Sequence, residues 1–129
     1  MSRRALPFVA SVLLSVFVLF TPASGVPTAP PGTDKVVHLA LFTLLATTGR
    51  HARIPTWPLA AGLAGYAVLS EVLQEALPLG RSATVGDVLA DLGGAAAGLA
   101  VVSLARARRA RAGRTGRAGA DLDQTRPTP

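Results

Sequence analysis

Four apolar stretches alternate with short polar ones along this chain of 129 residues. They lie near residues 5–21, 36–49, 59–77 and 85–105, and any charges inside them gather toward one end. A helix that crosses a bilayer needs roughly 17–25 apolar residues. The stretch at 36–49 is short, but the polar turn before it, where Lys35 can reach toward the surface, brings it near that length. The pattern predicts an all-α membrane protein with four transmembrane helices.

The first stretch has a second interpretation. Arg3 and Arg4 precede it and Ala23-Ser24-Gly25 follows it, an order that is also typical of a cleavable signal peptide. We predict a retained helix, because the later stretches already indicate a membrane protein. Residues 22–33 contain several prolines and glycines, which predict an extended loop.

Composition supports a membrane location. Half of the residues are hydrophobic and 16% are charged, which is too little charge to cover the surface of a soluble domain. The chain has no cysteine, so disulfides, a thiolate metal site and a cysteine nucleophile are excluded. The formal net charge is +6, but no aromatic side chains are interleaved with the arginines, and we expect no binding to nucleic acid.

The basic residues predict the orientation. If the N-terminus is cytoplasmic and four helices cross, all 13 basic residues except Lys35 and Arg81 lie inside, in agreement with the positive-inside rule. We therefore expect both termini in the cytoplasm. Residues 106–129 are rich in Arg, Ala and Gly, and we expect them to form a basic, disordered cytoplasmic tail near anionic lipid.

Three groups of polar residues lie at helix ends that this topology brings to the outer face. Several of them are one helical turn apart and so share a face of their helix, and Glu71 would lie about 9 Å inside the end of its helix. Charge in hydrocarbon is costly, so charged residues kept there pair with one another or do chemistry. The candidate functional cluster comprises Asp34, Lys35, His38, Glu71, Gln74, Arg81, Asp87 and Asp91.

Simpler structural roles explain part of this cluster. Asp87 can complete a capping box with Thr84 at the start of a helix, and Glu75 lies near enough to the surface to be solvated. Glu71 and Asp91 lie in largely apolar sequence and fit such roles less well. The meeting of all these residues at one face indicates a functional site.

The order and spacing of these motifs resemble the VanZ-like family of small bacterial membrane proteins. The matching positions are Asp34, Lys35 and His38; Ser70, Glu71 and Gln74; Pro78, Arg81 and Ser82; and Asp87, Gly94 and Gly98. The resemblance covers residues 34–105 and implies a VanZ-like transmembrane domain over residues 1–105, in the bacterial cytoplasmic (inner or plasma) membrane. It also implies a link with the cell envelope and with resistance to the glycopeptide teicoplanin. Asp91 departs from the pattern, because the family usually has Asn there, and an ionised carboxylate only accepts hydrogen bonds.

Two classes of function remain open. In the first, an outward-facing polar site binds or acts on a cell-envelope component, and Arg81, Lys35 and His38 pair with a lipid-linked or phosphate-bearing ligand. An enzyme of this class would use His38 or Glu71 as general base, oriented by a partner carboxylate. In the second class, the cluster only stabilises the association of the helices.

A membrane-embedded metal-dependent hydrolase is a further alternative. A metal site made of His38, Glu71, Asp87 and Asp91 is chemically feasible, but the chain has no H-E-x-x-H motif and offers one reliable imidazole. We therefore expect no metal and no cofactor, and membrane lipids as general partners.

Overall fold

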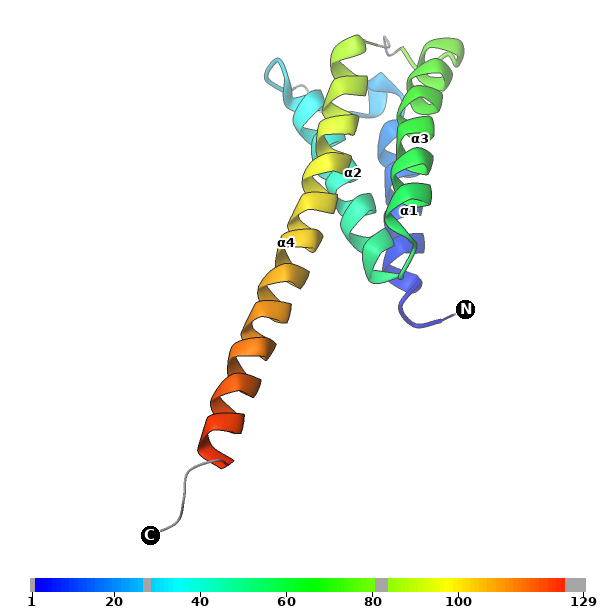
Figure 1. The fold of residues 1–129 in the computed structure, drawn as a ribbon. Helices are drawn as coiled ribbons and strands as arrows, with labels where there is room; N and C mark the ends of the chain where they lie inside the picture. The colour runs from blue at the N-terminus through cyan, green and yellow to red at the C-terminus, as the bar shows by residue number, and fades with distance from the viewer. Residues whose placement is uncertain (1, 27–28, 81–83, 125–129) are drawn as a thin grey trace.

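The computed structural model describes residues 2–26, 29–80 and 84–124. Most of them belong to four α-helices: α1 (Leu6–Leu19), α2 (Thr33–His51), α3 (Thr56–Ala76) and α4 (Val85–Gln124), with a 3₁₀ turn at Ala23–Gly25. The predicted all-α class and the four helices are confirmed. Figure 1 shows α1, α2, α3 and the first part of α4 as a bundle, from which the rest of α4 extends alone.

Local sequence explains the ends of α2. Gly32 precedes the helix in the left-handed region, at φ 86°, where a residue without Cβ meets little steric resistance. Asp34 lies in the first turn, and Arg50 and His51 lie in the last. These charges oppose the partial charges at the two helix ends.

The most extensive helix pair is α2 with α4, and two glycines of α4 make it possible. A Cβ added to Gly94 would lie 2.2 Å from the carbonyl oxygen of Leu39, and one added to Gly98 would lie 2.7 Å from that of Thr43. The two backbones are therefore in direct contact at these positions. The Thr43 hydroxyl donates a hydrogen bond to the Gly94 carbonyl oxygen, at 3.0 Å. Gly62 and Gly65 of α3 have open space instead.

The core lies around α2. Phe42 is fully buried and its ring stacks on that of Tyr66, with centroids 5.6 Å apart. The Tyr66 hydroxyl lies 3.1 Å from the Ser15 hydroxyl of α1. Leu19 at the end of α1 is also fully buried, so α1 contributes to the same core.

The prediction of four transmembrane helices is wrong. In the described part of the chain, one helix is long and apolar enough to cross a membrane: α4, over Val85–Arg114. The helix α1 is apolar but has 14 residues, which at 1.5 Å per residue span about 21 Å of a hydrocarbon core of about 30 Å.

The other two helices contain too many polar residues. α2 begins and ends with charged side chains and carries four threonines, Thr33, Thr43, Thr47 and Thr48. α3 ends in a polar segment that includes Glu71, Gln74 and Glu75. The predicted cytoplasmic position of both termini depended on four crossings, and it loses its basis with them.

The end of α4 also differs from the sequence interpretation. Residues 106–129 were expected to be disordered, but α4 continues to Gln124, and residues 125–129 lie outside the described part. Ala and Arg are among the strongest helix formers. The change from apolar to basic composition near residue 105 therefore does not end the helix.

Candidate functional site

The starts of α2 and α4 and the end of α3 lie at the same end of the bundle (Figure 1). Three buried side chains, one from each of these helices, meet there. His38 of α2 donates a hydrogen bond from Nδ1 to Oδ1 of Asp91 on α4, at 3.0 Å. The same nitrogen lies 3.7 Å from Oε1 of Glu71 on α3. The three residues are between 0% and 5% exposed. We call them the central triad.

Two carboxylate oxygens of the central triad are buried without a hydrogen-bond partner among the described residues: Glu71 Oε1 and Asp91 Oδ2. A buried polar atom without a partner costs about 1–3 kcal/mol, and more when it belongs to a charged group. Helix packing alone gives no reason to retain two such atoms in one place.

The electrostatics of the triad follow from burial and from its own charges. Burial raises the pKa of the Glu71 carboxyl, although the charge of His38 and the hydrogen bond from the Thr84 amide oppose this effect. Burial by itself would lower the pKa of His38. The hydrogen bond to Asp91 and the surrounding carboxylates outweigh it, so the pKa of His38 is raised.

An ion pair lies beside the triad. Lys35 Nζ is 3.3 Å from Oδ1 of Asp87, which is buried, and 3.3 Å from Oδ2 of Asp34, which is exposed. The hydrogen bonds to Asp87 and Asp34 raise the pKa of Lys35. Because the Lys35 side chain is about half exposed, its positive charge is accessible to solvent.

The start of α4 is tied to α3. The Thr84 hydroxyl accepts a hydrogen bond from the Asp87 amide, at 3.2 Å, and donates to the Asp87 carboxylate. The Thr84 hydroxyl therefore caps α4, but only half of the predicted capping box forms. In a capping box the acid would accept from the Thr84 amide, but this amide donates to Oε2 of Glu71, at 3.2 Å. Glu71 is thereby held in place beneath the first turn of α4.

Gln74 does not extend this arrangement. Gln74 is buried, but its Nε2 donates to the carbonyl oxygen of Leu19 at 2.7 Å, which ties α3 to the end of α1. Arg81 was predicted as part of the site, and it lies outside the described residues, as does Ser82. The structure thus groups Asp34, Lys35, His38, Glu71, Asp87 and Asp91.

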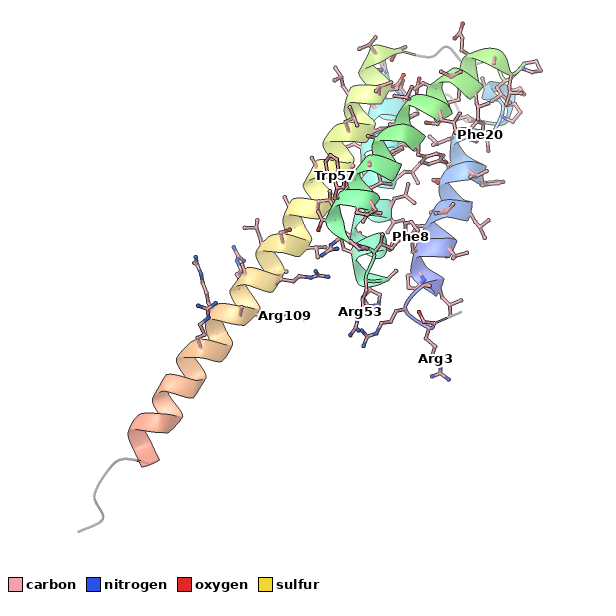
Figure 2. All side chains as sticks on the ribbon, turned by 45° about the vertical axis from the view of Figure 1, so that its right-hand side comes forward. Arg3, Phe8, Phe20, Arg53, Trp57 and Arg109 are labelled. Carbon is pink, nitrogen blue, oxygen red and sulfur yellow. The ribbon has the colours of Figure 1, made fainter. Side chains whose placement is uncertain are left out.

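A second polar feature lies at the opposite end of the bundle and was not predicted as a site. A cavity of about 390 Å³ is lined there by residues that include Arg4, Arg50, Arg53, Arg106 and Arg109. Figure 2 shows Arg53 and Arg109 at this end. We call this cavity the arginine cavity. In the sequence these arginines indicated only orientation, although the spacing of Arg106 and Arg109, three apart on a helix, places them near one face.

Comparison of the chain with family models, with curated proteins and with solved structures finds no match.

Proposed function

We propose that this chain is a VanZ-like protein of the bacterial cytoplasmic membrane whose central triad forms the core of a site that binds or acts on a cell-envelope component. The motifs around His38, Glu71 and Asp87 support the family. The observation that carries the functional proposal is the burial of two unpartnered carboxylate oxygens beside an imidazole at the junction of three helices.

Surface chemistry supports the membrane location. Large apolar side chains are exposed on every helix of the bundle, including Phe17 on α1, Val36 on α2, Trp57 on α3 and Leu89 on α4. Exposure of many large apolar side chains favours contact with lipid or with another protein. In the most apolar part of α4 only 22% of the residues are buried. The core helix of a soluble protein would be mostly buried.

The geometry supports chemistry at His38. A carboxylate that accepts a hydrogen bond from one imidazole nitrogen orients the ring and leaves the other nitrogen for a substrate. Asp91 holds Nδ1 of His38 in this way, and Glu71 lies beside the same edge of the ring. Lys35, at the rim, supplies the charge that a phosphate-bearing ligand would need.

The rival function, a packing network, fits less well. Networks that stabilise a buried interface satisfy all their members, because partly satisfied ones cost more than apolar packing. Within the part of the chain that the structure describes, the central triad leaves one oxygen of each carboxylate without a partner.

Drug tolerance tests the proposal. Production of the protein in a susceptible bacterium should raise tolerance to teicoplanin more than tolerance to vancomycin. His38→Asn and Glu71→Gln should abolish this effect while the amount of protein in the membrane stays the same, since both keep size and most hydrogen bonding. Glu75→Gln, a change to an exposed carboxyl one turn from Glu71, is the matched control and should behave as wild type.

Two results would contradict the proposal. An unchanged response to both drugs, with the wild-type protein present in the membrane, would remove the link to the envelope. A loss of protein abundance in step with the loss of tolerance would assign the triad to helix packing.

A further inference from the structure

The central triad has the donor set and the spacing of a metal site. One imidazole nitrogen and one oxygen from each of the two carboxylates all lie within 4.8 Å of one another. Ligands bound to one ion at about 2.0–2.2 Å in tetrahedral geometry lie about 3.4 Å apart. Nδ1 of His38 is 3.0 Å from Asp91 Oδ1 and 3.7 Å from Glu71 Oε1. Small side-chain movements would therefore bring all three atoms to one ion.

The charge of the triad favours a cation. Among the described residues, two buried carboxylates face one imidazole, and Lys35 is already paired with Asp87 and Asp34. A divalent ion bound to Nδ1 of a neutral imidazole, in place of the proton that this nitrogen donates to Asp91, and to two carboxylates gives a neutral centre. A water molecule could donate hydrogen bonds to both unpartnered oxygens, but it would leave the excess negative charge buried, which is costly.

We infer that His38, Glu71 and Asp91 bind a first-row divalent metal ion such as Zn²⁺ or Mn²⁺. Imidazole together with carboxylates suits these ions, whereas Mg²⁺ and Ca²⁺ prefer oxygen ligands alone. This reverses the expectation from sequence that no metal is bound. The missing H-E-x-x-H motif does not count against the site, because each ligand comes from a different helix.

The inferred ion would supply chemistry at the site of the proposed function. What the ion does in the cell therefore rests on that proposed function. Three protein ligands leave a coordination position open, which is the arrangement of catalytic rather than structural zinc sites. An ion here would also cancel the negative charge that repels anions and would leave a coordination position for an anionic oxygen. Together with Lys35 it would suit a phosphate-bearing ligand, the class that the sequence indicates.

Zinc binding to the purified full-length protein tests this inference. After treatment with a chelator, the protein in neutral detergent is dialysed against Zn²⁺ and its metal content is measured. We expect saturable binding of one ion per chain. Glu71→Gln, Asp91→Asn and His38→Asn should each weaken binding at least about 10-fold, since each removes a ligand. Glu75→Gln and His51→Asn change the same residue types at exposed positions and should bind as wild type.

A second measurement does not depend on the variants folding. Zinc should raise the unfolding temperature of the wild-type protein, because an ion that binds only the folded state stabilises it. The absence of a saturable site in the wild type would overturn the inference. So would undiminished binding in a folded Glu71→Gln protein.

These results are separable from the drug-tolerance test. Loss of tolerance in the triad variants, without zinc binding by the wild type, would leave the proposed function standing and remove the metal. Zinc binding by the wild type without any change in drug tolerance would leave the metal site standing and remove the proposed function.

Discussion

Thr84 makes hydrogen bonds to both α3 and α4. Its hydroxyl caps α4 by accepting from the Asp87 amide, while its own amide donates to Glu71 on α3. The hydroxyl belongs to the side chain, whereas the amide belongs to the backbone. Substitution at this residue can therefore remove the cap and leave the contact with the central triad.

Thr84→Ala should lower the free energy of unfolding by about 1 kcal/mol, the usual cost of losing an N-terminal cap. Thermal unfolding in detergent measures this change. Thr56→Ala is the control, because Thr56 is exposed at the start of α3, where no side chain caps the helix. Equal effects of the two substitutions would show that the hydroxyl of Thr84 does not stabilise α4.

Helical spacing predicted part of the site at the residue scale. It put the polar residues of each helix on one face, and the expected alternation of helix direction placed His38, Glu71 and Asp91 at ends that meet. These three residues form the central triad. Helical spacing did not separate Gln74 from them. Gln74 lies three residues after Glu71, and this rotation around α3 is enough to turn its amide toward Leu19 of α1. Which neighbouring helix a side chain faces decides such differences. The spacing of residues within one helix does not show this.

At the scale of elements, the close contact between α2 and α4 sets the position of the central triad. His38 and Asp91 are on these two helices, one turn or less before the points where Leu39 and Gly94 touch. A wider separation of the helices would lengthen the His38–Asp91 hydrogen bond. The G-x-x-x-G pattern of Gly94 and Gly98 thus supports both packing and the site.

Gly94→Ala should destabilise the protein by roughly 1–3 kcal/mol, because its Cβ would overlap the backbone of Leu39 and force the helices apart. Gly93→Ala is the matched control. A Cβ there meets nothing within 4 Å, and Ala is favoured over Gly in a helix by about 0.5–1 kcal/mol. Unfolding temperatures should therefore shift in opposite directions. A stabilised Gly94→Ala protein would contradict the close contact.

The apolar pattern of the sequence predicted where the helices lie, but it did not predict which of them is long and apolar enough to cross a membrane. The stretches at 5–21, 36–49, 59–77 and 85–105 each overlap one helix of the structure. Their ends differ because helix formation continues through polar residues of high helix propensity, as it does after residue 105 in α4. The same polar ends, at Asp34 and Lys35 in α2 and at Glu75 in α3, reduce the hydropathy that a spanning segment requires.

The two ends of the bundle differ in charge at the scale of the whole molecule. One end holds the central triad and four of the chain's acidic side chains: Asp34, Glu71, Asp87 and Asp91. The other holds the arginine cavity, where Arg106 reaches the carbonyl oxygen of Arg50 at 3.1 Å. A basic cavity between helices beside an apolar surface suits the head group of an anionic lipid. Lipid at this end would orient the molecule in the membrane, with the triad at the far side of the bundle.

Binding of a short-chain phosphatidylglycerol to the protein in neutral detergent tests whether the arginine cavity binds anionic lipid. At about 1 kcal/mol for each arginine near an anionic surface, the double substitution of Arg106 and Arg109 by Gln should weaken binding roughly 30-fold. The matched control is the double substitution of Arg108 and Arg114 by Gln, which removes the same charge from exposed positions of α4 that do not line the cavity. It should weaken binding much less, and added salt should reduce the difference. Equal losses in the two double variants would show that lipid responds to the overall charge of α4 and that the cavity has no special affinity for it.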